Sequence, residues 1–463
     1  MIDVNPSDTR DVVGEYPETS AHEVAQVLAA ARDAYPAWSA TTPSQRAELL
    51  DRIGSEILLR TAELGRLLAR EEGKTLPEAI GEATRAGQVF RFFAAEAVRL
   101  GGEAGASTRP GVSVEVTREP MGVFALITPW NFPLAIPAWK LAPALAFGNC
   151  AVLKPSEFTP ASALALRDIA DRAGLPPGVF GLVNGGAGPG TSLVEAAGVD
   201  GISFTGSVAT GRAIATRCAP RMKRLQLEMG GKNPLVVLDD ADLETAVNCA
   251  VNGAVNGAFF STGQRCTASS RLIVTAGIHD RFVDRLIERM RGLRVDHALK
   301  DGTDIGPVIH EEQLEKNLRY VEIGRSEGAR LVQGGERLQR ETPGWYMAPA
   351  LFTDTQPTMR INREEIFGPI ATITRVRDAE EALVVANDTE FGLSAGICTT
   401  SLKWATHFRR HAQAGLVMVN LPTAGLDHHL PFGGRKASSY GPREQGSAAR
   451  EFYTQGKTAY IAD

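Results

Sequence analysis

The hydrophobic rhythm of the chain changes about a quarter of the way along. Over residues 20–100, apolar side chains recur every three or four positions, a spacing typical of helices that bury one face. The capping box Ser20-Ala21-His22-Glu23 predicts the start of a first helix. Pro43 predicts the start of a second helix and Gly73 its end, and a third is expected over about 77–100. This part of the chain is therefore predicted to be helical.

From residue 123 onward, short apolar runs alternate with helical segments. The expected strands are residues 123–127, 151–153, 180–183, 202–204 and 224–227, and after Pro234 residues 235–238, 272–274, 371–376 and 416–419. This alternation predicts an α/β protein with parallel sheets covered by helices on both faces. Ligands of such sheets bind beyond the carboxyl ends of the strands. Because no low-complexity linker divides the chain, we expect a tight domain interface with a cleft.

A segment between these two parts has a different pattern. Val112, Val114 and Val116 alternate with polar residues, which indicates a half-exposed strand. Residues 101–111 before it are rich in glycine and predict a turn. A strand pair that projects from the body is one possibility.

Composition narrows the class of protein. The chain has 463 residues, 43% of them hydrophobic, and a net charge of −5 with no basic run, so two or three structural units and no nucleic-acid partner are expected. No apolar stretch is long enough to span a membrane, and the N-terminus does not resemble a signal peptide. Five widely spaced cysteines without a Cys-x-x-Cys pair argue against disulfides and zinc. We therefore expect a cytoplasmic protein without a metal site.

Cys266 lies in a turn between an Ala/Val/Asn-rich run and an apolar strand. Gly263 allows the backbone to turn tightly, and the small residues 267–269 leave space beside the sulfur. A thiolate is a strong nucleophile when its pKa is lowered and a substrate can reach it. Alone, a single cysteine is more often a small buried hydrophobe.

Two other candidates for chemistry follow expected strands. Glu228 precedes two glycines, where a carboxylate of raised pKa can act as a base, although a solvated carboxylate at a strand end is the plainer interpretation. Asn131 lies between Trp130 and Phe132 with prolines on both sides, and such a rigid amide can donate to an oxyanion. An ordinary turn asparagine remains its alternative.

Other strand ends carry features that suit a dinucleotide. The segment Gly206-Ser207-Val208-Ala209-Thr210-Gly211 lies between a strand and a helix, where close backbone approach and a helix N-terminus favour phosphate. It lacks the full Gly-x-Gly-x-x-Gly pattern, so a plain tight turn is about equally compatible. Lys154 and Glu157 could hold ribose hydroxyls, or form a surface charge pair at a helix start.

Taken together, several short motifs resemble the aldehyde dehydrogenase superfamily. In chain order they are Pro129-Trp130-Asn131-Phe132-Pro133, Phe204-Thr205-Gly206-Ser207, Leu227-Glu228-Met229-Gly230-Gly231-Lys232, Gly263-Gln264-Arg265-Cys266 and Glu364-Glu365-Ile366-Phe367-Gly368-Pro369. The resemblance covers nearly the whole chain. It implies a Rossmann-type NAD(P)-binding domain over residues 1–101 and 120–230, an α/β catalytic domain over 231–449, and a bridging β-arm over 102–119 and 450–463 that assembles homodimers or homotetramers.

The same resemblance implies roles for individual residues. Cys266 would be the nucleophile and Glu228 the general base, while Asn131 and the Cys266 backbone N–H would form the oxyanion hole. Lys140 and Glu444 stand at positions linked to proton movement. The implied cofactor is NAD or NADP, with contacts from Ile127, Trp130, Lys154, Glu157, Gly188, Phe204, Gly206, Ser207, Gly230, Glu365 and Phe367.

Within the superfamily, residues 261–271, 420–425, 431–436 and 440–446 are similar to those of 2-oxoglutarate semialdehyde (2,5-dioxopentanoate) dehydrogenases. An aldehyde substrate of this kind needs a cation for its far carboxylate. Arg265 is the first candidate, with Arg91 and His428 behind it, although a structural salt bridge is an equal alternative for Arg265. Glu157 would repel a 2′-phosphate, which favours NAD, yet this subgroup often accepts NADP.

Other functions and two departures from the family pattern stay open. The alternatives are a succinate semialdehyde or broad-specificity aldehyde dehydrogenase, a thiol hydrolase, and a non-catalytic homologue with the same fold. The tandem tetrapeptides Ala250-Val251-Asn252-Gly253 and Ala254-Val255-Asn256-Gly257 are expected to lengthen the helix before Cys266. The chain begins close to Asn5-Pro6, so an edge segment found in many members is expected to be missing.

Overall fold

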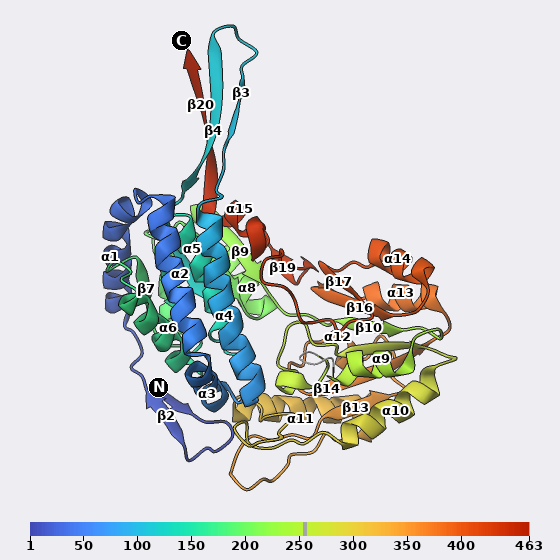
Figure 1. Ribbon diagram of the computed structural model, residues 1–463. Coiled ribbons are helices and arrows are strands. Elements are labelled where there is room, and N and C mark those ends of the chain that lie inside the picture. Colours follow the sequence, from blue (N-terminus) through green and yellow to red (C-terminus); the bar gives the residue numbers. More distant parts are fainter. Residues whose placement is uncertain (253–256, 463) are drawn as a thin grey trace.

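Two lobes lie side by side and a narrow arm projects from one of them (Figure 1). The computed structural model describes residues 1–252 and 257–462. Each lobe is built on one main sheet, with strand order β19-β9-β8-β5-β6-β7 in the first and β12-β13-β14-β11-β10-β16-β17 in the second. The predicted α/β architecture is therefore confirmed.

The first lobe contains a parallel sheet with one antiparallel edge strand. Its strands are β5 (Val123–Ile127), β6 (Cys150–Lys154), β7 (Phe180–Leu182), β8 (Gly201–Thr205), β9 (Arg224–Glu228) and β19 (Ser439–Tyr440). Its helices are α1 (Ala21–Ser39), α2 (Pro43–Leu59), α3 (Thr61–Glu72), α4 (Leu76–Ala97), α5 (Ala135–Ala146), α6 (Pro160–Arg172), α7 (Ala187–Glu195) and α8 (Val208–Cys218). Val123 to Leu126 are buried on both faces of the sheet, as parallel strands between helices must be.

One helix prediction in this lobe is wrong. The segment from Pro43 to Gly73 was expected to be a single helix, but it breaks at Arg60, whose φ of −104° and ψ of 17° leave the helical region. The Arg60 guanidinium bonds Glu56 on one side of the break and Glu63 on the other. No glycine or proline marks this break, so periodicity alone could not locate it. Gly73 does end α3, with a left-handed φ of 92°.

The second lobe has a mostly parallel sheet. Its strands are β10 (Pro234–Val237), β11 (Arg271–Thr275), β12 (Arg330–Gln333), β13 (Ala350–Thr353), β14 (Ile370–Val376), β16 (Ser394–Cys398) and β17 (Leu416–Val419), with β12 antiparallel to β13. Its helices are α9 (Leu243–Val247), α10 (His279–Arg291), α11 (Glu311–Ser326), α12 (Arg360–Arg363), α13 (Ala379–Asn387) and α14 (Leu402–His411). Of the tandem tetrapeptides, residues 253–256 lie outside the described residues, and a π-helical turn, Asn248–Asn252, follows α9.

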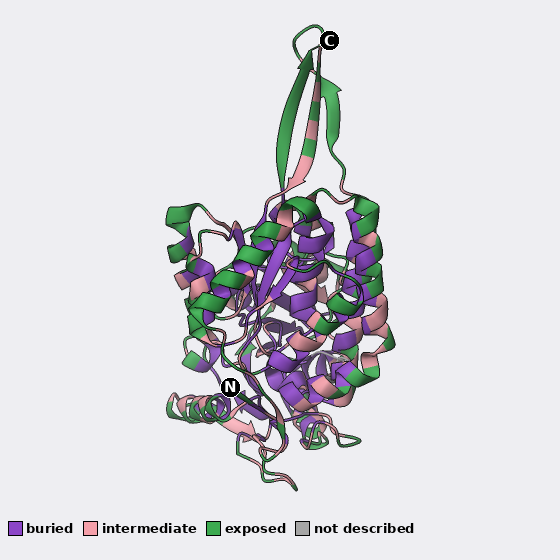
Figure 2. Ribbon diagram, turned by 90° about the vertical axis from the view of Figure 1, so that its left-hand side faces the viewer, coloured by how far each residue is buried: buried purple, intermediate pink, exposed green. Residues whose placement is uncertain are grey.

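The arm is a three-stranded antiparallel sheet rather than a strand pair. Its strands are β3 (Glu103–Ala106), β4 (Val112–Pro120) and β20 (Thr454–Ala462), in the order β20-β4-β3. β3 falls within the segment that was expected to be only a turn. Most residues of the arm are exposed, whereas the lobes below it have buried interiors under partly exposed outer helices (Figure 2).

Smaller elements complete the chain. They are β1 (Ile2–Val4), β2 (Val12–Glu15), β15 (Phe391–Gly392) and β18 (Arg435–Lys436), the 3₁₀ turns η1 (Ala219–Arg221), η3 (Phe260–Gly263) and η4 (Gly446–Ala449), and α15 (Arg450–Tyr453). Among the described residues, no helix has both the length and the apolar character that a membrane crossing requires. The domain limits given above stay a prediction, although β19 pairs with β9 and so joins residues 439–440 to the first lobe's sheet.

Candidate active site

A cavity of about 660 Å³ opens at the carboxyl ends of β5, β6 and β8. Of the residues predicted to bind a cofactor, its lining contains Ile127, Trp130, Lys154, Glu157, Phe204, Gly206 and Ser207. Gly188, Gly230, Glu365 and Phe367 lie outside that lining. The position is the one expected for a ligand of a parallel sheet, and the volume falls in the range of ligand pockets. We call this space the first cavity.

The rim of the first cavity carries groups suited to a dinucleotide. α8 begins there, and the Ser207 hydroxyl caps it by accepting the Thr210 N–H at 3.2 Å. Unpaired N–H groups at such a helix start attract phosphate. Lys154 Nζ lies 3.9 Å from Glu157 Oε2, and burial lowers the pKa of Lys154. The predicted Lys/Glu pair therefore exists at this cavity.

A second space, which we call the chamber, has a volume of about 550 Å³ and contains both predicted reactive residues, Cys266 and Glu228, in its lining. Thr205 lines the chamber as well as the first cavity, so the two spaces adjoin at the end of β8. Cys266 and Glu228 belong to the chamber lining alone, and Thr205 is the residue that both linings share.

The loop before Cys266 has an unusual backbone. Ser261 and Thr262 adopt left-handed conformations with φ of 48° and 57°, and Gly263 follows with a φ of 66°. A Cβ at Gly263 would collide with the carbonyl of Gly368, so this turn requires glycine. Left-handed backbone is costly for residues that carry a Cβ, and it persists only where neighbours hold it in place.

Asn131 is brought to this loop from the first lobe. Its buried side chain donates from Nδ2 to the Gln264 carbonyl at 2.9 Å. Asn131 therefore lies against the peptide that precedes the nucleophile, although the loop from β5 and the loop from η3 are far apart in sequence. This contact suits the predicted oxyanion role, because the amide has a second N–H.

Burial and neighbouring acids raise the pKa of both reactive groups. The pKa of Cys266 is raised to about 12, first by burial and then by the nearby Glu365 and Glu228 carboxyls. The pKa of Glu228 is raised well above its ordinary value, first by burial and then by Glu444. The Ser439 hydroxyl donates to Glu228 Oε2 at 2.5 Å. The raised pKa makes the Glu228 carboxylate a stronger base than a solvated carboxylate.

A buried polar chain lies beneath Glu228. Lys140 bonds Glu444 and donates to the Ser203 hydroxyl at 2.8 Å, while Trp139 Nε1 donates to Glu444 Oε2 at 2.8 Å. Lys140 and Glu444, both predicted to stand at positions linked to proton movement, thus form an ion pair with each other. Neither residue belongs to the chamber lining.

Two further contacts concern the predicted cofactor residues that lie outside the first cavity. Glu365 accepts the Gly231 N–H at 2.8 Å and occupies the space that a side chain at Gly230 would fill. The Trp130 and Phe367 rings meet edge to face at 5.3 Å. The Glu365 carboxyl therefore binds the backbone that follows Glu228, and it also raises the pKa of Cys266.

The structure separates the three predicted substrate residues. Arg265 lines the chamber, but its guanidinium donates to the Ser261 hydroxyl at 2.8 Å and pairs with Glu78 at 3.3 Å. Arg91 pairs with Asp51 and lies with His428 in a separate groove outside the chamber lining. Arg265 thus combines a structural ion pair with a place beside Cys266, whereas Arg91 and His428 do not meet the sulfur.

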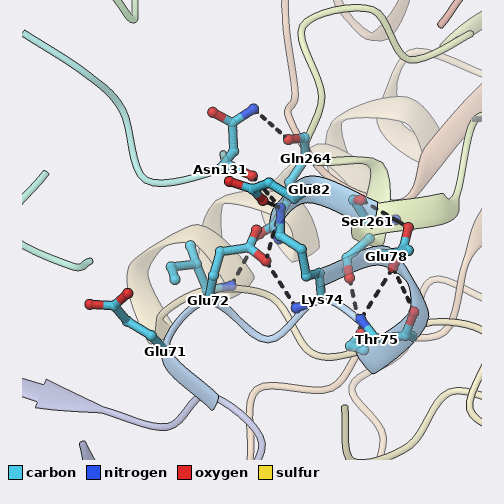
Figure 3. A network of polar contacts seen from close by, with 12 residues as sticks. Glu71, Glu72, Lys74, Thr75, Glu78, Glu82, Asn131, Ser261 and Gln264 are labelled. Atoms are coloured by element: carbon cyan, nitrogen blue, oxygen red, sulfur yellow. Dashed lines mark hydrogen bonds and ion pairs between the residues drawn. The ribbon is translucent and has the colours of Figure 1, made fainter. Parts of the chain in front are cut away.

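Sequence reasoning missed a buried network that supports both loops (Figure 3). Lys74 Nζ donates to Glu82 Oε2 at 2.5 Å and to the Asn131 carbonyl at 2.7 Å. Glu82 Oε1 accepts the Leu134 and Ala135 N–H groups and so caps α5. The Asn131 loop is therefore fixed at both ends by one buried ion pair.

Glu78 holds the other loop. Its Oε1 accepts the Ser261 N–H at 2.8 Å and the Ser261 hydroxyl at 2.9 Å, and its Oε2 accepts the Thr75 hydroxyl at 3.0 Å. Lys74, Glu78 and Glu82 recur every four residues, which places them on one side of α4 and of the turn before it. This spacing of charged residues is the feature of the sequence from which the buried network could have been predicted.

Comparison with known proteins identifies the family. The family model described as "Aldehyde dehydrogenase family" matches residues 1–459. The chain belongs to the aldehyde dehydrogenase family. It is 42% identical over 460 residues to an alpha-ketoglutaric semialdehyde dehydrogenase of Bacillus subtilis (strain 168), covering 99% of this chain and 93% of that protein. It is 41% identical over 437 residues to a betaine aldehyde dehydrogenase of Mesorhizobium japonicum, covering 94% and 88%.

Solved structures agree with this assignment. A crystal structure of a betaine aldehyde dehydrogenase from Staphylococcus aureus in complex with NAD⁺ superposes with a TM-score of 0.96 at 33% identity, covering 100% of this chain and 92% of that chain. This aldehyde dehydrogenase is therefore an enzyme of established fold whose relatives of nearly equal similarity carry different substrate names.

Alkylation should report the raised pKa of the Cys266 thiol. With no cofactor added, we expect iodoacetamide to react with Cys266 at pH 7.5 about two to three orders of magnitude more slowly than with a free cysteine, because little thiolate is present. The rate should rise with pH without an inflection below pH 10. Mass spectrometry measures the adduct. An inflection near pH 8 would contradict the expectation, and Cys266→Ala is the control, because the other four cysteines are buried.

The Lys74–Glu82 pair should stabilise the fold. In Glu82→Gln the new amide presents a donor to the Lys74 ammonium, which leaves a buried charge with a weaker partner. We expect a fall in Tm of several degrees, together with a lower kcat, measured by thermal scanning and steady-state assay. The matched control is Glu63→Gln, whose partner Arg60 lies at an exposed helix end. Equal Tm values for the two variants would show that the buried pair contributes nothing.

Proposed function

We propose that this aldehyde dehydrogenase oxidises 2-oxoglutarate semialdehyde to 2-oxoglutarate with NAD or NADP, through a covalent adduct on Cys266. The observation that carries the proposal is the placement of Cys266 and Glu228 in one chamber that adjoins a dinucleotide-sized cavity at Thr205. The similarity to the Bacillus subtilis alpha-ketoglutaric semialdehyde dehydrogenase supports the substrate. A succinate semialdehyde or betaine aldehyde dehydrogenase is the alternative, because the betaine aldehyde relatives are nearly as similar.

The first step forms a carbon–sulfur bond. Cys266 loses its proton and adds to the aldehyde carbon, which leaves negative charge on the former carbonyl oxygen. The second N–H of Asn131 and the Cys266 backbone N–H are the donors for that oxygen. Because the resting thiol has a raised pKa, binding of the substrate and cofactor must favour the thiolate, and its proton passes to solvent before Glu228 acts on water.

The residues at the first cavity fit a nicotinamide dinucleotide. The N-terminus of α8 at Gly206 and Ser207 suits the pyrophosphate, and Lys154 with Glu157 suits ribose hydroxyls. When bound, the nicotinamide supplies the acceptor for the hydride that leaves the adduct carbon. The Glu157 carboxylate favours NAD, because it would repel a 2′-phosphate.

Hydrolysis completes the cycle. Loss of hydride leaves an acyl group bound to the Cys266 sulfur as a thioester. Glu228 takes a proton from a water molecule, the resulting hydroxide attacks the thioester carbon, and the sulfur leaves to regain a proton while the acid departs. Burial raises the pKa of Glu228 most, and of the pair beneath it Glu444 raises that pKa further while Lys140 lowers it.

Replacing Glu228 should separate oxidation from hydrolysis. In Glu228→Gln we expect a burst of reduced cofactor of about one equivalent per active site, followed by turnover at least about 100-fold slower than in the wild type. Stopped-flow absorbance measures both phases, and Cys266→Ala, which should give no burst, is the control. An unchanged steady-state rate in Glu228→Gln would remove Glu228 from the proposed role.

We further propose that the arm assembles a homodimer or homotetramer. A three-stranded sheet exposed on both faces gains little from its own core, and Tyr460 and Ile461 expose 61% and 46% of their surfaces. Pairing with a second copy of this chain would cover these side chains and the open strand edges.

Acidic substitutions on the arm should weaken assembly. For the double variant Tyr460→Glu and Ile461→Glu we expect a lower mass than for the wild type by light scattering, with unchanged circular dichroism, because charge is costly in a buried contact. Val384→Glu, which makes the same kind of change on exposed α13, is the control and should not lower the mass. A wild-type monomer, or equal masses for all three proteins, would disprove the role of the arm.

A further inference from the structure

Arg85 on α4 is a cation without a carboxylate partner. Its guanidinium lines the chamber that holds Cys266, and within the described residues it takes part in no ion pair. It donates from one nitrogen to the Leu426 carbonyl and from another to Gln445 Oε1 at 3.0 Å. A guanidinium has five N–H groups, so these two bonds leave donors for a ligand.

The carboxylates that share this lining are already engaged. Glu78 binds Ser261 and Arg265, Glu82 binds Lys74 and the start of α5, and Asp304 accepts the Arg294 N–H. The remaining charged groups of the lining are Glu228 and Arg265. Burial lowers the pKa of Arg85, and among the charged groups near it Asp427 raises that pKa and Arg265 lowers it. Arg85 thus keeps its charge in a chamber whose described charged groups form no ion pair with it.

Gln445 beside Arg85 has an unpartnered donor. Its side chain is almost fully buried, with 1% of the residue exposed, and it lines the same chamber. The Oε1 atom must be the one that faces Arg85, because arginine can only donate, so Nε2 is fixed on the other side. Nε2 has no hydrogen-bond partner within the described part of the chain. A buried N–H group left in this state needs an acceptor from a ligand.

We propose that Arg85 and Gln445 form the subsite for the carboxylate at the far end of the aldehyde substrate. This inference rests on the proposed function and assigns its specificity. The guanidinium and the neighbouring amide both offer N–H donors to an anion, while Arg265 adds positive charge beside Cys266. A quaternary ammonium aldehyde would instead meet an uncompensated cation. The subsite therefore selects dicarboxylic semialdehydes over betaine aldehyde.

The experiment compares substrates within each variant of the full chain. With saturating NAD⁺, kcat/KM is measured for 2,5-dioxopentanoate, succinate semialdehyde, pentanal and betaine aldehyde. In Arg85→Gln we expect the ratio of each carboxylate-bearing substrate to pentanal to fall about 10- to 100-fold, mainly through KM. The ratio of betaine aldehyde to pentanal should rise. Arg85→Lys should restore part of the loss, because lysine keeps the positive charge but cannot donate two N–H bonds to one carboxylate as a guanidinium does.

Arg91→Gln is the matched control, since Arg91 is on the same helix, pairs with Asp51 and lies outside the chamber lining. Gln445→Glu is the second variant, in which a carboxylate replaces the free donor, and it should lower the same ratio even if Arg85→Gln does not fold. An unchanged ratio in the Arg85 and Gln445 variants, or an equal fall in Arg91→Gln, would overturn the subsite.

The outcomes also separate this inference from the proposed function. If the wild type prefers succinate semialdehyde or betaine aldehyde to 2,5-dioxopentanoate, the proposed substrate is wrong, and the variants still decide the subsite through the ratio for succinate semialdehyde. If the wild type prefers 2,5-dioxopentanoate and the variants keep its ratio to pentanal, the proposed function stands and the subsite is wrong.

Discussion

The buried ion pair between Lys74 and Glu82 is the contact on which the geometry of the site depends. A lysine and a glutamate with almost no exposure are costly to bury, and they are tolerated because each one is also bonded to the backbone that it holds. Lys74 and Glu82 hold the loop that carries Asn131, and Glu78 holds the loop that carries Cys266. One side of α4 thus sets the distance between the two halves of the expected oxyanion hole, with Arg85 continuing it into the chamber.

Much of the fold and of the site could be predicted from the sequence. The strands β5 and β10 are continuous apolar runs, and the capping box at Ser20 marks the start of α1. The roles of Cys266 and Glu228 were predicted only from the whole set of motifs that resemble the family, because each residue alone is more often structural.

The other features of the fold and of the site could not be predicted from the sequence, because they depend on contacts between segments that are distant along the chain. β16 has the sequence Ser-Ala-Gly-Ile-Cys, whose small residues carry almost no strand preference, and it is buried between β10 and β17 only by tertiary packing. The break at Arg60 has no breaker residue. Glu82 looks like an ordinary helical glutamate until the start of α5, more than fifty residues later, is placed against it. The same holds for Gln445 and Arg85.

The course of the chain near its C-terminus has a practical consequence. Within a short stretch it supplies Ser439 to Glu228, Glu444 to Lys140 and Gln445 to Arg85, and then continues through α15 into the outer strand of the arm (Figure 1). A fusion partner or purification tag attached after Asp463 would hang from the tip of this strand. Pulling or crowding there would act, along the same short stretch of chain, on Ser439, Glu444 and Gln445. For this protein the choice of which end to tag is therefore a choice about the reaction centre.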